Sequence, residues 1–326
     1  MKSLLLMVVR VAGALLALLL GLLLFSTSES PPLAGQPYAT EAGIAYPAVV
    51  AHRGLSGLAP EETAVAYRLA RALGVDYLEA DVQRTRDGVL VAFHDDSVAR
   101  TTNAASRFPE RAEAGIGDFT WAELAQLDAG SWFNEAYPER ARPAYAGLRI
   151  LRIDELLEIA GNDGPGLYLE TKAPEQFPGI EEELVALLAA RGFVRTSSDG
   201  PARLIFQSFS IDSLRRLKEL APHVPRIYLI GTEMEAEQGW DQLLEAAAEV
   251  GDGVGPVGYL AYPWYSGPAH ERGLVIHPYT VNLTWQMQLL SFFGSDGFFT
   301  DRSDLLLAFY GRPVPDVEGI LADLGY

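Results

Sequence analysis

Residues 75–82, VDYLEADV, form a largely apolar run in which Glu79 and Asp81 stand two residues apart. Residues i and i+2 of a β-strand point to the same face, so these carboxylates are expected to converge near the carboxyl end of a buried strand. Residues 166–172, GLYLETK, repeat the pattern with a glutamate and a lysine two residues apart. Charged groups at the ends of two buried strands predict a functional site at one edge of a sheet.

Apolar runs alternate with helix-like stretches through the rest of the chain. A repeated β-α order implies parallel strands joined by right-handed crossovers, and eight such units predict a closed (β/α)8 TIM barrel. A doubly wound open sheet is the alternative. The expected strands are Ala48–His52, Tyr77–Val82, Leu167–Lys172, Arg203–Gln207, Arg226–Ile230, Val254–Val257, Leu274–Val281 and Gly297–Thr300. The expected helices are Pro60–Leu73, Ile180–Arg191, Ser210–Ala221, Trp240–Val250, Thr284–Phe293 and Asp304–Tyr310.

The second strand is followed by a departure from this order. Asp87-Gly88 predicts a turn, and Val89–His94 predicts a short returning strand. Residues 96–152 are then expected to form an insertion at the barrel rim, in which Thr120–Glu123 is a capping box that opens a short helix. Loops at this face carry the site in such barrels, so the insertion is expected to contribute to substrate recognition.

The N-terminus predicts export. Residues 4–25 are apolar apart from Arg10, with Lys2 before them and Glu29 after them. Under the positive-inside rule, this charge distribution places the bulk of the protein outside the cytoplasm.

The fate of residues 1–25 is left open by the sequence. The apolar segment is long enough to remain as a membrane anchor, the interpretation we favour. Cleavage near Ser26–Ser28 would instead leave a periplasmic or secreted protein. Residues 26–47 are expected to be a linker, and residues 48–326 the barrel domain.

Composition excludes several classes of function. The 326-residue chain is 49% hydrophobic, which is ample for one large core. Its formal net charge of -18 argues against nucleic acid as a partner, because binding to phosphates needs a cationic surface. The chain has no cysteine, so disulfides, thiolate nucleophiles and Cys-based metal sites are excluded.

Nine short motifs, taken in order, give the chain a resemblance to a known family. They are His52-Arg53-Gly54, Ala59–Thr63, Glu79-Ala80-Asp81, Thr85–Gly88, Val91–Asp95, Glu170-Thr171-Lys172, Gln207-Ser208-Phe209, Thr280-Val281-Asn282 and Thr300-Asp301. This ordered set, spanning residues 49–307, resembles the glycerophosphodiester phosphodiesterase family. One departure is visible, since Glu62 stands where the family usually has an asparagine.

The acidic residues predict a metal site. Glu79, Asp81 and Glu170 offer only hard oxygen donors, which suit one divalent cation, Ca²⁺ or Mg²⁺, better than zinc. The resemblance implies that carboxylates at these positions hold the metal.

The basic residues predict phosphate binding and proton transfer. Arg53 and Lys172 are expected to bind the phosphate. His52 and His94 match the catalytic histidines of the family, and imidazole can act as general acid or base near neutral pH. We assign His52 as base and His94 as acid, although the reverse assignment fits equally well.

Other polar residues are weaker candidates. Gln207 and Asn282 are expected to bind substrate, although Asn282 could instead cap a helix. His277 could lie near the substrate, whereas Asp301 is expected to be an N-cap. Glu61 is expected to pair with Arg53.

With these residues, the resemblance implies a metal-dependent enzyme that hydrolyses small-molecule glycerophosphodiesters to an alcohol and sn-glycerol 3-phosphate. The resemblance implies attack by a neighbouring glycerol hydroxyl, but the residues alone are equally consistent with attack by water. Two alternatives stay open. One is a barrel phospholipase that acts on intact lipid at the membrane, and the other is a catalytically inert barrel that serves as a binding module.

Overall fold

The computed structural model describes residues 35–194 and 200–326. The predicted export segment and the first part of the predicted linker lie outside the described residues. Within the described ranges, no helix is both long enough and apolar enough to cross a membrane.

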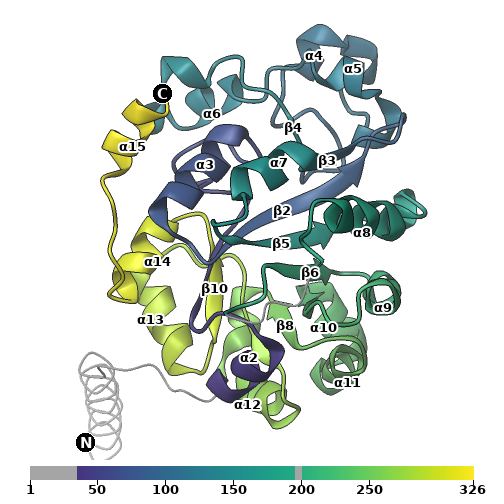
Figure 1. The fold of residues 1–326 in the computed structure, drawn as a ribbon, viewed down its shortest axis with the longest axis vertical. Coiled ribbons are helices and arrows are strands. Elements are labelled where there is room, and N and C mark those ends of the chain that lie inside the picture. Colours follow the sequence, from purple (N-terminus) through teal and green to yellow (C-terminus); the bar gives the residue numbers. More distant parts are fainter. Residues whose placement is uncertain (1–34, 195–199) are drawn as a thin grey trace, which may run out of the picture.

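Eight parallel strands form the centre of the fold (Figure 1). They are β1 (Ala48–Ala51), β2 (Tyr77–Arg84), β5 (Gly166–Thr171), β6 (Leu204–Ser208), β7 (Arg226–Ile230), β8 (Gly253–Pro256), β9 (Val275–Ile276) and β10 (Gly297–Thr300). Their order is β10-β1-β2-β5-β6-β7-β8-β9. The ends of this row meet, because Asp296 N donates to Ile276 O at 2.9 Å and Phe299 N donates to Pro278 O at 3.1 Å. This closure confirms the predicted barrel and excludes the open sheet.

Helices surround the strands in sequence order. They are α3 (Ala64–Leu73), α7 (Ile153–Ala160), α8 (Ile180–Ala190), α9 (Ile211–Leu220), α10 (Thr232–Gln238), α11 (Trp240–Val250), α12 (Pro263–Glu271), α13 (Thr284–Phe292), α14 (Ser303–Phe309) and α15 (Val317–Asp323). Four of these helices, α7, α10, α12 and α15, were not expected from the sequence. Helix α7 supplies the helix that the second unit lacked, and Gly267 and Pro268 weaken the helical signal of α12.

The segment after β2 folds beside the barrel. Strand β3 (Leu90–Ala92) pairs antiparallel with β2, and β4 (Leu151–Arg152) pairs antiparallel with β3. Between them lie α4 (Ala104–Arg107), α5 (Trp121–Leu124), α6 (Ser131–Ala136) and the 3-10 turns Pro109–Arg111, Ile116–Asp118, Pro138–Arg140 and Pro143–Tyr145. The capping box predicted at the start of α5 is present, since Thr120 N donates to Glu123 Oε2 at 2.9 Å. An apolar cluster that includes Phe93, Ile116 and Phe119 gives this segment its own small core.

The structure differs from the sequence prediction in the second half of the predicted linker. Residues Gln36–Ala42 form helix α2, and Gly43 ends it in the left-handed conformation that glycine adopts easily. Ala39 and Ile44 are buried against side chains of the barrel interior, and Ala45 N donates to Tyr77 Oη at 3.0 Å. This segment therefore covers the amino-terminal end of the barrel, and the opposite end remains for the site.

Candidate active site

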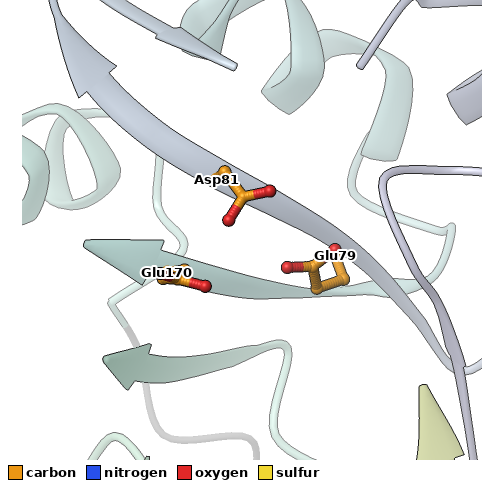
Figure 2. Close-up of side chains that lie close together, drawn as sticks. All are labelled: Glu79, Asp81 and Glu170. Atoms are coloured by element: carbon orange, nitrogen blue, oxygen red, sulfur yellow. The ribbon is translucent and has the colours of Figure 1, made fainter. Parts of the chain in front are cut away.

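Three carboxylates converge at the carboxyl ends of neighbouring strands (Figure 2). Glu79 and Asp81 extend from β2, and Asp81 is paired in register with Glu170 of β5. One oxygen from each carboxylate lies within 4.8 Å of the others, and all three residues are at most 5% exposed. The predicted alternation along β2 therefore brings the expected acidic residues together.

The charges in this cluster are unequally compensated. Lys172 Nζ lies 3.5 Å from Asp81 and 3.3 Å from Glu170, and Arg53 Nε lies 3.2 Å from Asp81 Oδ2. Burial disfavours ionisation of Asp81, but Lys172 and Arg53 outweigh it and lower its pKa below the ordinary value. Burial and the charge of Asp81 raise the pKa of Glu79 to about 7 and that of Glu170 well above its ordinary value. The cluster therefore has too little positive charge for three ionised carboxylates.

The donor set fits a hard divalent cation. The three side chains offer carboxylate oxygens, and the buried Asp81 Oδ2 has only the ion pair with Arg53 Nε and accepts no hydrogen bond. Gln207 is 1% exposed and donates from Nε2 to Glu79 Oε1 at 2.9 Å, while its own Oε1 has no hydrogen-bond partner. Buried acceptors without donors are costly, and a bound cation would remove that cost.

The loop after β1 directs a backbone donor at the cluster. Arg53 has a φ of 54° and Gly54 a φ of 83°, so the chain turns through the left-handed region. Arg53 N consequently donates to Glu79 Oε2 at 2.8 Å, and its guanidinium reaches Glu61 Oε1 at 2.9 Å. The expected pairing of Glu61 with Arg53 is confirmed.

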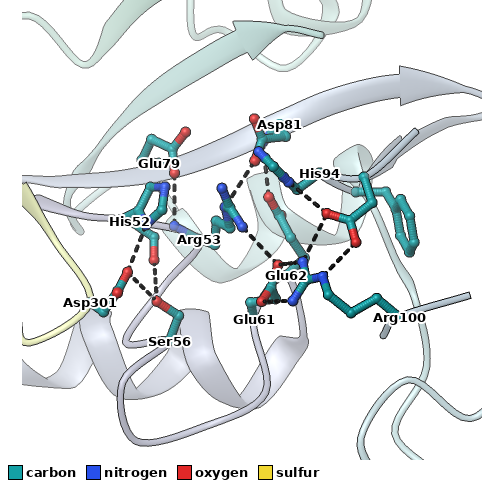
Figure 3. Close-up of polar contacts among 12 residues, drawn as sticks. His52, Arg53, Ser56, Glu61, Glu62, Glu79, Asp81, His94, Arg100 and Asp301 are labelled. Atoms are coloured by element: carbon teal, nitrogen blue, oxygen red, sulfur yellow. Dashed lines mark hydrogen bonds and ion pairs between the residues drawn. The ribbon is translucent and has the colours of Figure 1, made fainter. Parts of the chain in front are cut away.

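His52 is oriented by the carboxylate of Asp301, the residue that directly follows β10 (Figure 3). His52 Nδ1 lies 2.6 Å from Asp301 Oδ1, which also accepts from Ser56 Oγ at 2.9 Å. Asn282 Nδ2 donates to Asp301 Oδ2 at 2.6 Å, and Asn282 Oδ1 accepts from Asp301 N at 2.8 Å. The prediction of Asp301 as an N-cap is wrong, because Arg302 occupies the cap of α14 and the Asp301 side chain binds His52.

His94 belongs to a second polar chain (Figure 3). His94 Nδ1 lies 2.7 Å from Asp95 Oδ1, and Arg100 Nη2 donates to the same oxygen at 2.9 Å. Arg100 also donates twice to Glu61, at 3.0 and 2.7 Å, and Glu61 binds Arg53. Arg100 therefore connects one histidine with the phosphate-binding candidate. The sequence offered no signal for it, because Arg100 follows the returning strand in a segment without periodic pattern.

Glu62, the departure from the family pattern, is buried beneath the acidic cluster. Its Oε1 accepts from Asp81 N at 3.0 Å, and Tyr67 Oη donates to its other oxygen. Burial, with the charges of Asp81 and Glu79, raises the pKa of Glu62 well above the ordinary value. Its φ of 58° lies in the region that asparagine adopts more easily than glutamate. Glu62 thus supports the backbone of Asp81 from behind the cluster.

One pocket gathers most of the predicted residues. Its lining consists of His52, Arg53, Glu79, Asp81, His94, Glu170, Lys172, Gln207, Phe209, Leu229, Tyr279 and Phe299. Eight of the nine predicted site residues are in this lining. The ninth, Asn282, is not in the lining. Its Nδ2 donates to Asp301, and its Oδ1 accepts from Thr300 Oγ1. His277 is fully buried in the barrel interior, 3.3 Å from Tyr168 Oη, and burial lowers its pKa to about 4.

Comparison with known proteins identifies the family. Residues 52–305 match the model of the glycerophosphoryl diester phosphodiesterase family. The chain belongs to this family. The resemblance inferred from the nine motifs is therefore confirmed, and the matched range contains every predicted site residue.

Individual relatives agree with this assignment. The chain is 38% identical over 256 residues to a glycerophosphodiester phosphodiesterase of Bacillus subtilis, covering 78% of this chain and 84% of the relative. The structure of a phosphodiesterase from Oleispira antarctica in complex with the product sn-glycerol-3-phosphate is 29% identical, with a TM-score of 0.64, and covers 82% of this chain and 97% of that chain. A glycerophosphodiester phosphodiesterase structure from Agrobacterium tumefaciens is 26% identical, with a TM-score of 0.60. The match covers 80% of this chain and 99% of that chain.

Proposed function

We propose that this protein hydrolyses glycerophosphodiesters to an alcohol and sn-glycerol 3-phosphate with the help of one divalent cation. The carrying observation is the convergence, in one pocket, of a buried acidic triad, two cations and two histidines that each have a carboxylate partner. The product bound in the Oleispira antarctica relative supports the assignment of the substrate class.

Arg53 and Lys172 bind the phosphate in this proposal. Both line the pocket, and a guanidinium suits the paired oxygens of a phosphate while an ammonium supplies a second charge. Glu79, Asp81 and Glu170 would hold Ca²⁺ or Mg²⁺, which would neutralise charge on the phosphate when bound. Gln207 positions Glu79 and keeps a free acceptor oxygen for the substrate.

The two histidines divide the proton transfers. With Nδ1 held by Asp301, His52 has Nε2 available to take the proton of the attacking hydroxyl. With Nδ1 held by Asp95, His94 can donate a proton to the departing alkoxide in the same way. The attacking group is either water, which gives sn-glycerol 3-phosphate directly, or a neighbouring glycerol hydroxyl, which gives a cyclic phosphate that water then opens. Asn282 acts on His52 through Asp301 rather than on the substrate.

The test is release of sn-glycerol 3-phosphate from glycerophosphocholine. EDTA should abolish release, and added Ca²⁺ or Mg²⁺ should restore it. Glu79→Ala should be inactive, and His52→Ala and His94→Ala should each lower kcat by about 10² to 10⁴-fold. His223→Ala is the matched control, because His223 is an exposed histidine outside the pocket.

The same assay decides between the alternatives. Faster hydrolysis of intact diacyl phospholipid than of the deacylated diester would favour the phospholipase. No EDTA-sensitive release from any diester would favour the inert binding module, and near-normal turnover in both histidine variants would overturn the assigned acid and base.

The location of the enzyme is a separate part of the proposal. The apolar residues 4–25 support export, with retention of this segment as a membrane anchor. A separate proposal concerns residues 96–152, which would form an insertion at the barrel rim that contributes to substrate recognition. Mass spectrometry of the N-terminus from the membrane fraction tests the anchor. An intact N-terminus is expected, and a processed N-terminus in a soluble extracytoplasmic fraction would exclude retention.

A further inference from the structure

One wall of the pocket is aromatic. Phe209, after β6, and Tyr279, after β9, both line the pocket, with ring centroids 5.9 Å apart and ring planes at 88°. Two rings at a right angle make a corner. The charged residues of the same lining come from β2, β5 and the segments that follow β1, β3 and β5, so the aromatic wall and the charged groups belong to different strands of the barrel.

A third ring completes this feature. Tyr259 follows β8, its hydroxyl donates to Thr232 Oγ1, and the preceding Gly258 N donates to Tyr279 O at 2.9 Å. A Cβ placed on Gly231 would lie 3.9 Å from the Phe209 ring and 4.0 Å from Tyr279 Oη. All three rings therefore surround the end of β7, and we refer to Phe209, Tyr259 and Tyr279 as the aromatic corner.

The aromatic corner borders the phosphate-binding candidates and remains accessible. Lys172 Nζ lies 5.8 Å from the centroid of the Phe209 ring, so Phe209 is beside the cation that would bind the phosphate. Phe209 is 37% exposed and Tyr259 is 45% exposed. A substituent attached to a phosphate at Lys172 can therefore contact these rings.

The charge around the corner favours a cationic substituent. Helix α10 begins at Thr232, which binds the hydroxyl of Tyr259, and carries Glu233 and Glu237 without any lysine or arginine. Its third glutamate, Glu235, is hydrogen-bonded to Tyr265. The positive charge of Lys172 opposes a second cation, but in the proposed function Lys172 pairs with the anionic phosphate of the same substrate. Aromatic faces attract cations through the ring quadrupole, and the attraction is strongest for a cation that is poorly hydrated.

We propose that the aromatic corner binds the quaternary ammonium group of the leaving alcohol, which makes choline-type diesters the preferred substrates. This inference rests on the proposed function. A primary ammonium has the same charge but loses more hydration on contact with the rings. An uncharged group of the same shape gains only apolar contact.

The experiment compares kcat/KM for three diesters of glycerol phosphate. Their alcohols are choline, ethanolamine and 3,3-dimethylbutanol, in which carbon replaces the charged nitrogen of choline. The wild-type enzyme should prefer the choline diester over the uncharged isostere by about 2- to 30-fold. Phe209→Leu should bring this ratio close to one, and Phe209→Trp should preserve it.

A matched control distinguishes loss of the Phe209 ring from the effect of any Phe→Leu substitution on the protein. Phe292→Leu makes the same change at a 49% exposed phenylalanine at the end of α13, away from the pocket, and should leave the ratio unchanged. A wild-type ratio near one, or a ratio that Phe209→Leu does not alter, overturns the proposal while leaving the proposed function intact. If no diester is hydrolysed, the proposed function fails, and isothermal titration of the choline diester and its isostere measures the same ratio as binding.

Discussion

Arg100 is the residue on which the placement of His94 depends most. Its guanidinium binds Asp95 and Glu61 with two hydrogen bonds each, and these carboxylates hold His94 and Arg53. A lysine keeps the charge but cannot form both paired contacts at once. We expect Arg100→Lys to lower kcat by about 10-fold or more, with a smaller change in KM, and to shift the pH profile of kcat.

The control for Arg100 is another arginine of the same segment. Arg107 donates to Gln126 Oε1 at 2.7 Å and lies outside the pocket, so Arg107→Lys should leave kcat and its pH profile unchanged. If Arg100→Lys behaved like Arg107→Lys, Arg100 would have no positioning role.

Asp301 is expected to matter for both activity and stability. Burial would raise its pKa, but the hydrogen bond and charge of His52, with hydrogen bonds from Asn282 and Ser56, lower it to about 2 from 3.8. Asp301→Asn removes the charge that orients His52, and we expect kcat to fall by about 10²-fold. The measurement is steady-state hydrolysis at saturating metal.

The stability effect of Asp301→Asn has a defined dependence on pH. A carboxyl whose pKa is lowered by folding stabilises the protein above its ordinary pKa, and this contribution is lost as pH falls toward the folded value. The variant should therefore be less stable than wild type by on the order of 2 kcal/mol at pH 7, and the gap should narrow between pH 4 and pH 2. Urea unfolding at a series of pH values measures it, and a gap independent of pH would contradict the assigned cause.

At the residue scale, sequence reasoning succeeded where spacing alone determines contact. Glu79 and Asp81 share a strand, so alternation predicted their convergence. The contact between His52 and Asp301 joins residues 249 positions apart. An aspartate before a helical pattern is also typical of an N-cap, which is why the sequence suggested a different role for Asp301.

At the scale of elements, the turn between β1 and α3 depends on Gly54. Its φ is 83°, and a Cβ there would lie 2.7 Å from the backbone carbon of Ala66 in α3. Gly54→Ala should therefore lower the free energy of unfolding by about 2–5 kcal/mol, from backbone strain and overpacking together.

The substitution Gly74→Ala measures the cost of backbone strain without the cost of overpacking. Its φ is 78°, but a Cβ there would have no atom within 4 Å, so Gly74→Ala should cost only about 1 kcal/mol. Urea unfolding of both variants gives the comparison. Equal losses would show that close approach to α3 contributes nothing.

The sequence predicted strands better than short helices. The barrel strands are apolar runs next to turn signals, and their burial on both faces makes them recognisable. Helix α2 has seven residues and is stabilised by packing against the barrel end rather than by its own periodicity, so the sequence suggested a linker.

At the scale of the whole molecule, the carboxylates that would bind the metal are expected to destabilise the metal-free protein. The chain carries a net charge of -18, yet the site adds three buried carboxylates that the neighbouring cations do not fully neutralise. Metal-free protein should therefore be least stable at pH values high enough to ionise all three carboxyl groups. A bound cation reverses this effect, because it binds only the folded arrangement.

The substitution Glu170→Gln tests whether a buried carboxylate destabilises the metal-free protein. Folding raises the pKa of Glu170, through burial and the charge of Asp81, so this carboxyl makes metal-free protein less stable as pH rises above the ordinary value of 4.5. A glutamine has no such charge and can donate a hydrogen bond to Asp81. In EDTA at pH 8, the variant should therefore melt at a higher temperature than wild type.

Saturating Ca²⁺ or Mg²⁺ should reverse this order. Wild type gains about 2.7 kcal/mol when the cation is present at a hundred times its Kd, and the variant gains less because it has lost one charged ligand. Thermal unfolding of both proteins, with EDTA and with each cation, gives six melting temperatures. The order of wild type and variant in EDTA must be reversed in the cation that binds. Gln126→Glu, which adds a carboxylate on the exposed side of the β3–β4 segment, controls for charge in general. If wild type were the more stable protein in EDTA, or if the cation shifted both proteins equally, the acidic cluster would not be the metal site.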